Sequence, residues 1–598
     1  METKYPLTWN LEALFKGGSG SADFTAFVAG AEAECEALLQ ELREYGESAA
    51  PADRLTDWTR KLQSVLARLR EADSFVACLT SQNMADKRAV GWTERVQTAF
   101  ARFKQASDLY EAKLAAVPDA EWREWTSKPD TAEIRFPLNE KRDSAKNKLP
   151  PALEAVASEL SVDGYHGWGE HYNTIVGRMS IPWEKDGKTE HLSAGQAKNK
   201  LSDPSPSVRE DMFAKWEEAW AGQAELGADA LNRIAGFRLK LYGLRGRRDP
   251  LKEPLELNRM SRRTLDAMWA AVEGSIAPLK RYLDLKARLL GKEKTGWQDL
   301  SAPIFSSQEK IPYGEASELI IGAFERFSPG MAKLARNALE NGWIEAEDRP
   351  GKRPGGFCTS FPIGKTSRIF MTYSGTPDNV STLAHELGHA YHAELVQHLP
   401  PLAQEYAMNV AETASTFAEG LVSDVLLRRA GSDEEKLAIL DERLNSAVSF
   451  CMDIRARFLF ETRFYERRAA GMLDAAELCD LMVEAQKQAF GDALGSWHPH
   501  FWVSKMHFYL TDVPFYNFPY TFGYLFSTGL AADAEQEGVS FAERYDGLLR
   551  DTGVMTVEQL AERHLGANLE EPDFWNDAVA RAVADVEEFA SLSALFSK

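Results

Sequence analysis

Apolar residues return every three or four positions over long stretches of the chain, with charged residues between them. This spacing places the apolar side chains on one face of a helix, so it predicts amphipathic α-helices. Pro and Gly punctuate the segments between these stretches, as in 203–206 and 350–356. The pattern therefore indicates a mainly α fold, with predicted helices over 24–44, 55–72, 93–116, 208–242, 261–290 and 434–472.

Two short segments read as β-hairpins. Residues 181–189 contain Asp186-Gly187, a pair typical of a two-residue hairpin turn. A second hairpin is expected between 356–361 and 368–373. The first hairpin marks the candidate domain boundary, so we expect a helical N-terminal domain over 1–180 and a longer helical domain over 181–598.

The overall charge changes the picture of possible partners. The formal net charge is −21, with 90 acidic and 69 basic residues, which would repel a phosphate backbone and excludes nucleic acid as an expected partner. No apolar stretch reaches the roughly 20 residues that span a bilayer, and the first residues do not read as a signal peptide. Five scattered cysteines fit reduced thiols, so we expect a cytoplasmic protein without a membrane partner.

The strongest motif is His385-Glu386-Leu387-Gly388-His389. Two histidines four residues apart project from one face of a helix and can share one zinc ion. Glu386 is offset from them, which suits a general base that takes a proton from water at the metal. Thr376 as N-cap and Pro377 as the first helical residue favour a helix here.

A catalytic zinc needs a third protein ligand and one open position. The metzincin pattern would place Gly at 392 and His at 395, but this chain has His392 and Leu395. The third ligand is therefore expected to be a carboxylate on the next helix. Glu412 lies among small residues that let two helices approach closely, and Glu405 and Glu419 are its rivals.

Glu419 has a second possible role. It follows Glu412 by seven residues and can accept a hydrogen bond from a ligand histidine, although a surface salt bridge is an equal alternative. His392 and His398 are expected to be exposed or bridging histidines rather than ligands.

The motif and its surroundings resemble a known family. Residues 385–389, followed by Ala-Glu-Thr-Ala-Ser-Thr at 411–416, are similar to the oligoendopeptidase F and thimet oligopeptidase family of gluzincin metallopeptidases. The likeness includes 9–11, 355–359 and the aromatic stretch near 515, and is closest to the bacterial oligoendopeptidase F branch. It implies Glu412 as the third ligand of one Zn²⁺ per chain. It also implies two helical lobes around a deep channel that admits short unstructured peptides.

An aromatic stretch over 506–524 carries the remaining candidates. Aromatic residues at helical spacing are usually core packing. The resemblance implies instead that His507 and Tyr524 stabilise the oxyanion, while Tyr516 and Tyr520 line the cleft. Where the thimet branch has a glycine-rich loop, this chain has Thr-Asp-Val-Pro at 511–514, so we expect a stiffer loop.

The segment 368–376 leads into the motif helix and reads as a strand. If its edge is exposed, it can pair with an extended peptide, and we expect Tyr373 and Gly375 to contact substrate. A purely structural hairpin is an equal alternative.

The sequence and the resemblance together predict a zinc-dependent endopeptidase of short peptides, with Glu386 as general base. One alternative is a metallocarboxypeptidase or dipeptidyl carboxypeptidase on a similar helical scaffold. Another is a peptide-binding scaffold with a structural zinc, which would usually show four protein ligands rather than three.

Overall fold

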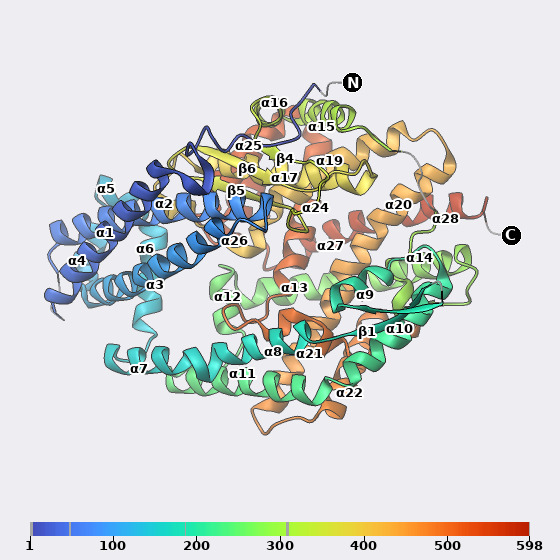
Figure 1. Ribbon diagram of the computed structural model, residues 1–598, viewed down its shortest axis with the longest axis horizontal. Helices are drawn as coiled ribbons and strands as arrows, with labels where there is room; N and C mark the ends of the chain where they lie inside the picture. The colour runs from blue at the N-terminus through green and yellow to red at the C-terminus, as the bar shows by residue number, and fades with distance from the viewer. Residues whose placement is uncertain (1–3, 47–49, 186, 306–309, 597–598) are drawn as a thin grey trace. The chain divides into compact units, whose positions relative to one another are not determined.

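Helices dominate the computed structural model, which describes residues 4–46, 50–185, 187–305 and 310–596 (Figure 1). The strands of this described part form three small sheets of two or three strands. The prediction of a mainly α fold is therefore confirmed.

The chain forms two compact units, each built from three separate stretches of sequence. Unit 1 comprises Met1–Lys148, Glu309–Val425 and Asp533–Gly566, and unit 2 comprises Leu149–Gln308, Leu426–Ala532 and Ala567–Lys598. Neither unit begins or ends at residue 180. The division into domains 1–180 and 181–598 stays a prediction.

The first three predicted helices form a bundle in unit 1. They are α1 (Ala22–Glu44), α2 (Ala52–Gln82) and α3 (Lys87–Ala116). Ser21 and Asp86 are the N-cap residues of α1 and α3, and their side chains accept hydrogen bonds from backbone N–H groups of the first turn. The bundle buries large side chains such as Trp58, Leu62 and Tyr110. The other helices of this unit are α4 (Asp119–Trp125), α5 (Pro129–Ala132), α6 (Arg135–Lys146), α15 (Tyr313–Phe327), α16 (Pro329–Glu340), α17 (Pro377–Val396), α18 (Met408–Ala411), α25 (Val539–Asp551) and α26 (Val557–Leu565), and α19 (Thr413–Arg429) begins in it.

Three long helices expected in unit 2 are interrupted. Two of them are each divided into two helices at a glycine, Gly222 in 208–242 and Gly274 in 261–290, because glycine stabilises helical backbone poorly. The third is interrupted by a π-helical turn at Ser449–Asp453. The resulting helices are α10 (Pro206–Ala221), α11 (Ala224–Leu244), α13 (Arg262–Glu273), α14 (Ile276–Leu289), α20 (Asp433–Val448) and α21 (Ile454–Arg468).

Shorter helices complete unit 2. They are α7 (Pro151–Ser161), α8 (Gly167–Gly177), α9 (Ala194–Lys200), α12 (Lys252–Leu257), α22 (Ala475–Phe490), α23 (Phe501–Ser504), α27 (Pro572–Ala582) and α28 (Val586–Ser593), and α24 (Phe518–Glu537) begins in it.

Both predicted hairpins are present. In unit 2, β1 (Ile181–Lys185) pairs antiparallel with β2 (Lys188–Leu192); Asp186 of the expected turn lies outside the described residues. In unit 1, β5 (Phe357–Phe361) pairs antiparallel with β6 (Thr366–Phe370), with Phe357 opposite Phe370. A short strand that the sequence did not predict, β4 (Ile344–Glu345), runs parallel to β6 on its other side. Unit 2 also contains a parallel pair, β3 (Thr295–Gly296) and β7 (Leu494–Ser496).

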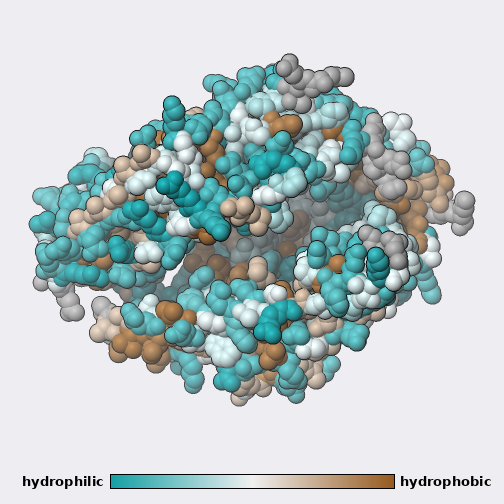
Figure 2. All heavy atoms as spheres, in the orientation of Figure 1, coloured by the Kyte–Doolittle hydropathy of each residue, from teal (hydrophilic) through white to brown (hydrophobic). Residues whose placement is uncertain are grey.

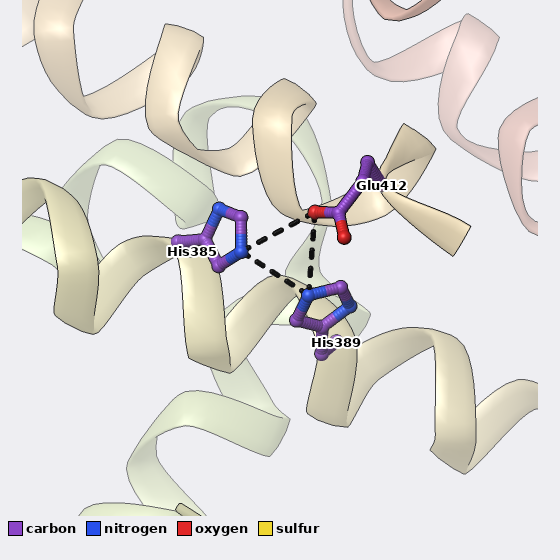
Figure 3. Close-up of side chains that lie close together, drawn as sticks. All are labelled: His385, His389 and Glu412. Carbon is purple, nitrogen blue, oxygen red and sulfur yellow. Dashed lines mark hydrogen bonds and ion pairs between the residues drawn. The ribbon is translucent and has the colours of Figure 1, made fainter. Parts of the chain in front are cut away.

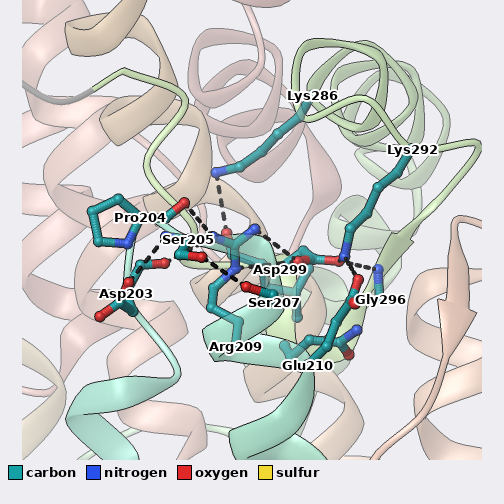
Figure 4. Close-up of polar contacts among 12 residues, drawn as sticks. Asp203, Pro204, Ser205, Ser207, Arg209, Glu210, Lys286, Lys292, Gly296 and Asp299 are labelled. Atoms are coloured by element: carbon teal, nitrogen blue, oxygen red, sulfur yellow. Dashed lines mark hydrogen bonds and ion pairs between the residues drawn. The ribbon is translucent and has the colours of Figure 1, made fainter. Parts of the chain in front are cut away.

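A buried network of charges organises part of unit 2 (Figure 4). The side chains of Arg209 and Asp299 are both completely buried, and the guanidinium donates two hydrogen bonds to one carboxylate oxygen at 3.2 and 3.0 Å. The other oxygen accepts from Lys292 Nζ at 2.6 Å and from the backbone N–H of Gly296 at 3.1 Å. Because every charge has an opposite partner, the network is a structural feature of the core.

The surface agrees with the acidic, polar composition. Hydrophilic residues cover most of the face shown in Figure 2, and hydrophobic residues there occur in small groups. Among the described residues, the helices are too short or too polar to cross a membrane.

Candidate metal centre and catalytic residues

The motif lies on α17 of unit 1, as predicted. Thr376 caps the helix through a reciprocal pair of hydrogen bonds with Asn379, and Pro377 occupies the first helical position. The helix therefore begins at a residue fixed by local sequence. His385 and His389 follow one turn apart and point to the same side (Figure 3).

Glu412 joins the two histidines from the junction between α18 and α19 (Figure 3). The Nε2 atoms of His385 and His389 are 3.2 Å apart, and Glu412 Oε2 lies 3.4 and 3.5 Å from them. Ligands about 2.0–2.1 Å from a tetrahedral zinc ion lie about 3.3 Å from one another. The three donor atoms thus have the spacing, as well as the chemistry, of three corners of a zinc site.

Glycine lets the two ligand-bearing segments approach this closely. A Cβ atom on Gly388 would lie 2.5 Å from the carbonyl oxygen of Ala414 and 2.7 Å from Cα of Ser415. Only a residue without a side chain fits there. The small residues around Glu412, noted in the sequence, therefore form a direct backbone contact between α17 and α19.

Glu419 fixes the orientation of one ligand histidine. Its Oε1 lies 2.5 Å from His385 Nδ1, and its Oε2 accepts a hydrogen bond from the hydroxyl of Ser381 at 3.3 Å. A proton on Nδ1 leaves the Nε2 lone pair of His385 facing Glu412 and His389, as a metal ligand requires.

Glu405 forms an ion pair with Arg70, and the donor group found among the described residues contains Glu412 rather than Glu405. His392 is completely buried, with Nε2 2.8 Å from Thr552 Oγ1 and 3.1 Å from the carbonyl oxygen of Leu549. It is a bridging histidine, whereas His398 is exposed.

The carboxylates and imidazoles shift one another's protonation. Burial alone would lower the pKa of His385, but the hydrogen bond that it donates to Glu419 and the nearby carboxylates outweigh this effect and raise the pKa to about 9. Burial would raise the pKa of Glu412, but His389, His385 and Ser415 outweigh it and lower the pKa to about 2. The carboxylate of Glu412 is therefore ionised and available as a ligand.

Glu386 has the surroundings of a proton-transfer group. Its side chain is buried, and its Oε2 has no hydrogen-bond partner in the described part of the chain. Burial raises its pKa, the two histidines oppose this rise, and Glu412 and Glu419 add to it. A carboxylate with a raised pKa and an unused oxygen suits a general base that later acts as an acid.

The segment expected to offer a peptide-binding edge does not lie at an edge of the described sheet. The expectation for 368–376 is wrong because β6 is the central strand, with β4 and β5 on its two sides. The N–H groups of Met371 and Tyr373 are already bonded to the carbonyls of Glu345 and Ala346. Within the described sheet, β5 supplies an outer edge instead. The sequence did not show this because β4 has only two residues, too few for a recognisable strand pattern.

Tyr373 and Gly375 both contact a neighbouring loop of unit 1. The hydroxyl of Tyr373 donates to the carbonyl of Ile311 at 2.9 Å, and the carbonyl of Gly375 accepts from the N–H of Ile311 at 2.9 Å. Gly375 has φ +91°, so it is required by its own turn. Their contact with substrate stays a prediction.

The aromatic candidates lie in unit 2, and three of the four form one cluster. The ring of His507 lies 4.8 Å from that of Tyr516 and 6.3 Å from that of Tyr520, and the hydroxyl of Tyr520 donates to that of Tyr516 at 3.3 Å. Tyr524 instead stacks on Phe450 at 4.6 Å.

One further member of this cluster, Asn517, was missed by the sequence analysis. Its Oδ1 lies 2.8 Å from Nδ1 of His507 and also accepts a hydrogen bond from Arg457 at 3.1 Å. No sequence motif marks this contact, because Arg457 lies 60 residues earlier on α21.

Comparison with known proteins agrees with this architecture. Residues 326–577 match Peptidase family M3, and residues 113–180 match Oligopeptidase F. The chain is 22% identical to Oligopeptidase PepF of Bacillus subtilis (strain 168) over 568 residues, which cover 92% of this chain and 82% of that protein.

Two solved structures share the fold. A putative peptidase from Chlamydophila abortus has a TM-score of 0.83 and 17% identity, with 98% of each chain covered. Oligoendopeptidase-F from Enterococcus faecium has a TM-score of 0.68 and 16% identity, with 94% of this chain and 98% of that chain covered. From these matches, the chain belongs to peptidase family M3, in its oligoendopeptidase F branch.

Proposed function

We propose that this M3 peptidase is a zinc-dependent endopeptidase that hydrolyses internal bonds of short, unstructured peptides, with one Zn²⁺ per chain. The observation that carries the proposal is the convergence of His385, His389 and Glu412 at separations of 3.2–3.5 Å. Two imidazoles and one carboxylate leave a coordination position open, as in catalytic rather than structural zinc sites.

The three donor residues hold the metal, and Glu419 orients His385. A bound zinc ion would act as a Lewis acid that polarises the scissile carbonyl and acidifies water. The remaining chemistry belongs to the side chains. Glu386 takes the proton from the attacking water at its free Oε2 and delivers it to the leaving amine.

The outer edge of β5 is the proposed place for the substrate backbone. A Cβ atom on Gly356, which directly precedes β5, would lie 3.2 Å from Oε1 of Glu386, so this segment runs past the proposed general base. Backbone pairing with β5 is tolerant of side chains and would suit peptides of varied sequence.

The aromatic cluster of unit 2 supplies further proposed catalytic groups. On the family resemblance, we propose that Tyr524 contributes to oxyanion stabilisation, and that His507, Tyr516 and Tyr520 contact substrate. A donor to the oxyanion is worth about 10²–10³ in kcat. Replacement of each tyrosine by Phe, with kcat measured separately, would rank their contributions.

Substitution of the general base tests the chemistry. Glu386→Gln should retain zinc but lose about 10²–10⁴ of kcat, since the amide cannot take the proton. Glu394→Gln, on the same helix, is the matched control and should keep normal turnover. Full activity in Glu386→Gln would overturn the assignment.

The main alternative is a metallocarboxypeptidase or dipeptidyl carboxypeptidase, which must recognise a free terminal carboxylate. Cleavage inside a peptide blocked at both ends, read by mass spectrometry, would support the endopeptidase. Cleavage only of peptides with a free C-terminus would support the alternative. A non-enzymatic scaffold is tested separately: activity lost on chelation and restored by zinc would exclude it.

We also propose a cytoplasmic location. The support is the cysteine usage, since all five cysteines are unpaired and three of them are buried. Fractionation of cells that express the protein, followed by immunodetection, tests this proposal. Recovery outside the cytoplasm would contradict it.

A further inference from the structure

The hydrogen bonds around His507 in unit 2 determine which of its ring nitrogens carries the proton. Nδ1 lies 2.8 Å from Oδ1 of Asn517, and the same oxygen accepts a hydrogen bond from Nη1 of Arg457 at 3.1 Å. Arginine is only a donor, so the atom facing it must be the amide oxygen of Asn517. The partner of Nδ1 is thus an acceptor, and Nδ1 must be the donor.

The orientation of Asn517 is itself fixed. Its side chain is 1% exposed, and its Nδ2 has no hydrogen-bond partner among the described residues. A rotated amide would place NH₂ against the guanidinium and against the N–H of His507, and would leave the oxygen without a donor. Arg457 cannot turn to relieve this, because its guanidinium is held by two bonds to Asp453 and lies 5.2 Å over the ring of Phe501.

We infer that Asn517 and Arg457 are positioning residues that hold His507 as the neutral Nδ1–H tautomer, so that its Nε2 is a hydrogen-bond acceptor for the N–H of a bound peptide. The inference rests on the proposed function for the identity of the ligand, but not for the tautomer. An Nε2 atom without a proton accepts a hydrogen bond, whereas the role that the family resemblance implies for His507, stabilisation of the oxyanion, requires a donor.

The charges around the ring keep it neutral. Burial lowers the pKa of His507 to about 4, and the cations Lys505, Arg457 and Lys198 add to this effect, which the hydrogen bond that His507 donates to Asn517 opposes. The imidazolium, which could donate from both nitrogens, is therefore absent near neutral pH.

The neighbouring tyrosines then divide the donor and acceptor roles. The hydroxyl of Tyr520 donates to the oxygen of Tyr516, so the proton of Tyr516 points elsewhere. In this cluster Tyr516 is the side chain with a hydroxyl proton available for an oxyanion, and His507 Nε2 is the matching acceptor for an amide N–H. A peptide group offers one of each.

Neutron diffraction of deuterium-exchanged crystals of the zinc-loaded enzyme tests the tautomer directly. We expect a deuteron on Nδ1 of His507 and none on Nε2. A deuteron on Nε2 would overturn the inference. This measurement needs no variant and no enzymatic activity. It therefore tests the tautomer of His507 independently of the peptidase proposal.

The pH profile of a charge variant tests the role in function. Asn517→Asp places a carboxylate beside Nδ1 and favours the imidazolium, which has no acceptor. The acid limb of kcat/KM should then move to higher pH by at least about one pH unit. Asn445→Asp adds the same charge in the same unit, beside Lys286 and Tyr282, and should leave the limb in place. If the limb of Asn517→Asp also stays in place, the proposed role of His507 Nε2 is refuted.

Discussion

Substitution of Gly388 by Ala tests whether close helix contact builds the metal site. The new Cβ atom would lie 2.5 Å from the carbonyl oxygen of Ala414, whereas ordinary contact begins near 3.4 Å. The α17 and α19 backbones would therefore have to separate by about 0.9 Å. Glu412 directly precedes α19, so this movement would carry it away from the two histidines.

Both metal binding and stability should decrease. Overpacking costs about 1–3 kcal/mol, and Ala regains about 1 kcal/mol of helix propensity, which leaves a net destabilisation of at most about 2 kcal/mol. Ligand distances tolerate only about 0.2 Å, so a shift several times larger should lower zinc affinity by at least about tenfold.

The assay is competition with a chelating zinc indicator, combined with thermal unfolding of the metal-free protein. Gly420→Ala is the matched control, because Gly420 lies exposed on α19 with nothing within 4 Å of the added Cβ. It should bind zinc normally and be equally or more stable. Wild-type zinc affinity and stability in Gly388→Ala would refute the argument that backbone contact positions Glu412.

Three further substitutions test other parts of the structure. Glu419→Gln should reduce zinc affinity by about 10–100-fold in a chelator competition, because an amide orients His385 less strongly than a carboxylate does. Burial raises the pKa of Glu461 to about 8, against Arg238 and the N–H of Phe515, so its contribution to stability is present below the unfolded pKa and lost as pH rises through 8. Glu461→Gln should therefore raise the melting temperature more at pH 9 than at pH 5. Arg209→Met removes the two hydrogen bonds from the guanidinium to buried Asp299, which keeps Lys292 as its remaining cationic partner, and should cost about 1.5–3 kcal/mol in denaturant unfolding.

Each of these variants has a control outside the interaction that it tests; Glu466 and Arg233 are exposed, and Glu394 is partly exposed. Glu394→Gln should keep zinc affinity, Glu466→Gln on α21 should show no such pH dependence, and Arg233→Met should cost less than about 1 kcal/mol because its ion pair with Asp229 is exposed. A test variant that behaves like its control would contradict the corresponding explanation.

Local sequence predicted the parts of the site that depend on neighbouring residues. The N-cap at Thr376, the helix after it and the one-turn spacing of His385 and His389 all follow from short-range rules. The sequence left Glu405 as a rival of Glu412, and the preference for Glu412 came from the family resemblance. The ion pair of Glu405 with Arg70 joins residues more than 300 positions apart. Chain-distant pairs of this kind carry no local signature.

The predictions of the strand order and of the helix ends were wrong for different reasons. A two-residue strand such as β4 has no periodicity, so the sequence could not show that β6 lies between two other strands. The apolar pattern continues through Gly222 and Gly274, which hides the ends of α10 and α13. The proton position inferred for His507 depends on an arginine 50 residues earlier, and no pattern near residue 507 reports this contact.

The construction of unit 1 from three stretches of chain has a consequence for biosynthesis. The helix α17, which carries His385 and His389, packs on α25: Tyr391 donates to Asp546 at 2.6 Å, and Nε2 of His392 lies 3.1 Å from the carbonyl of Leu549. At about 5–20 residues per second, a ribosome that has finished α17 needs roughly 8–30 s more to deliver α25. Throughout that interval the face of α17 that later packs on α25 lacks its partner helix, so we expect this part of unit 1 to complete its packing only after α25 has left the ribosome.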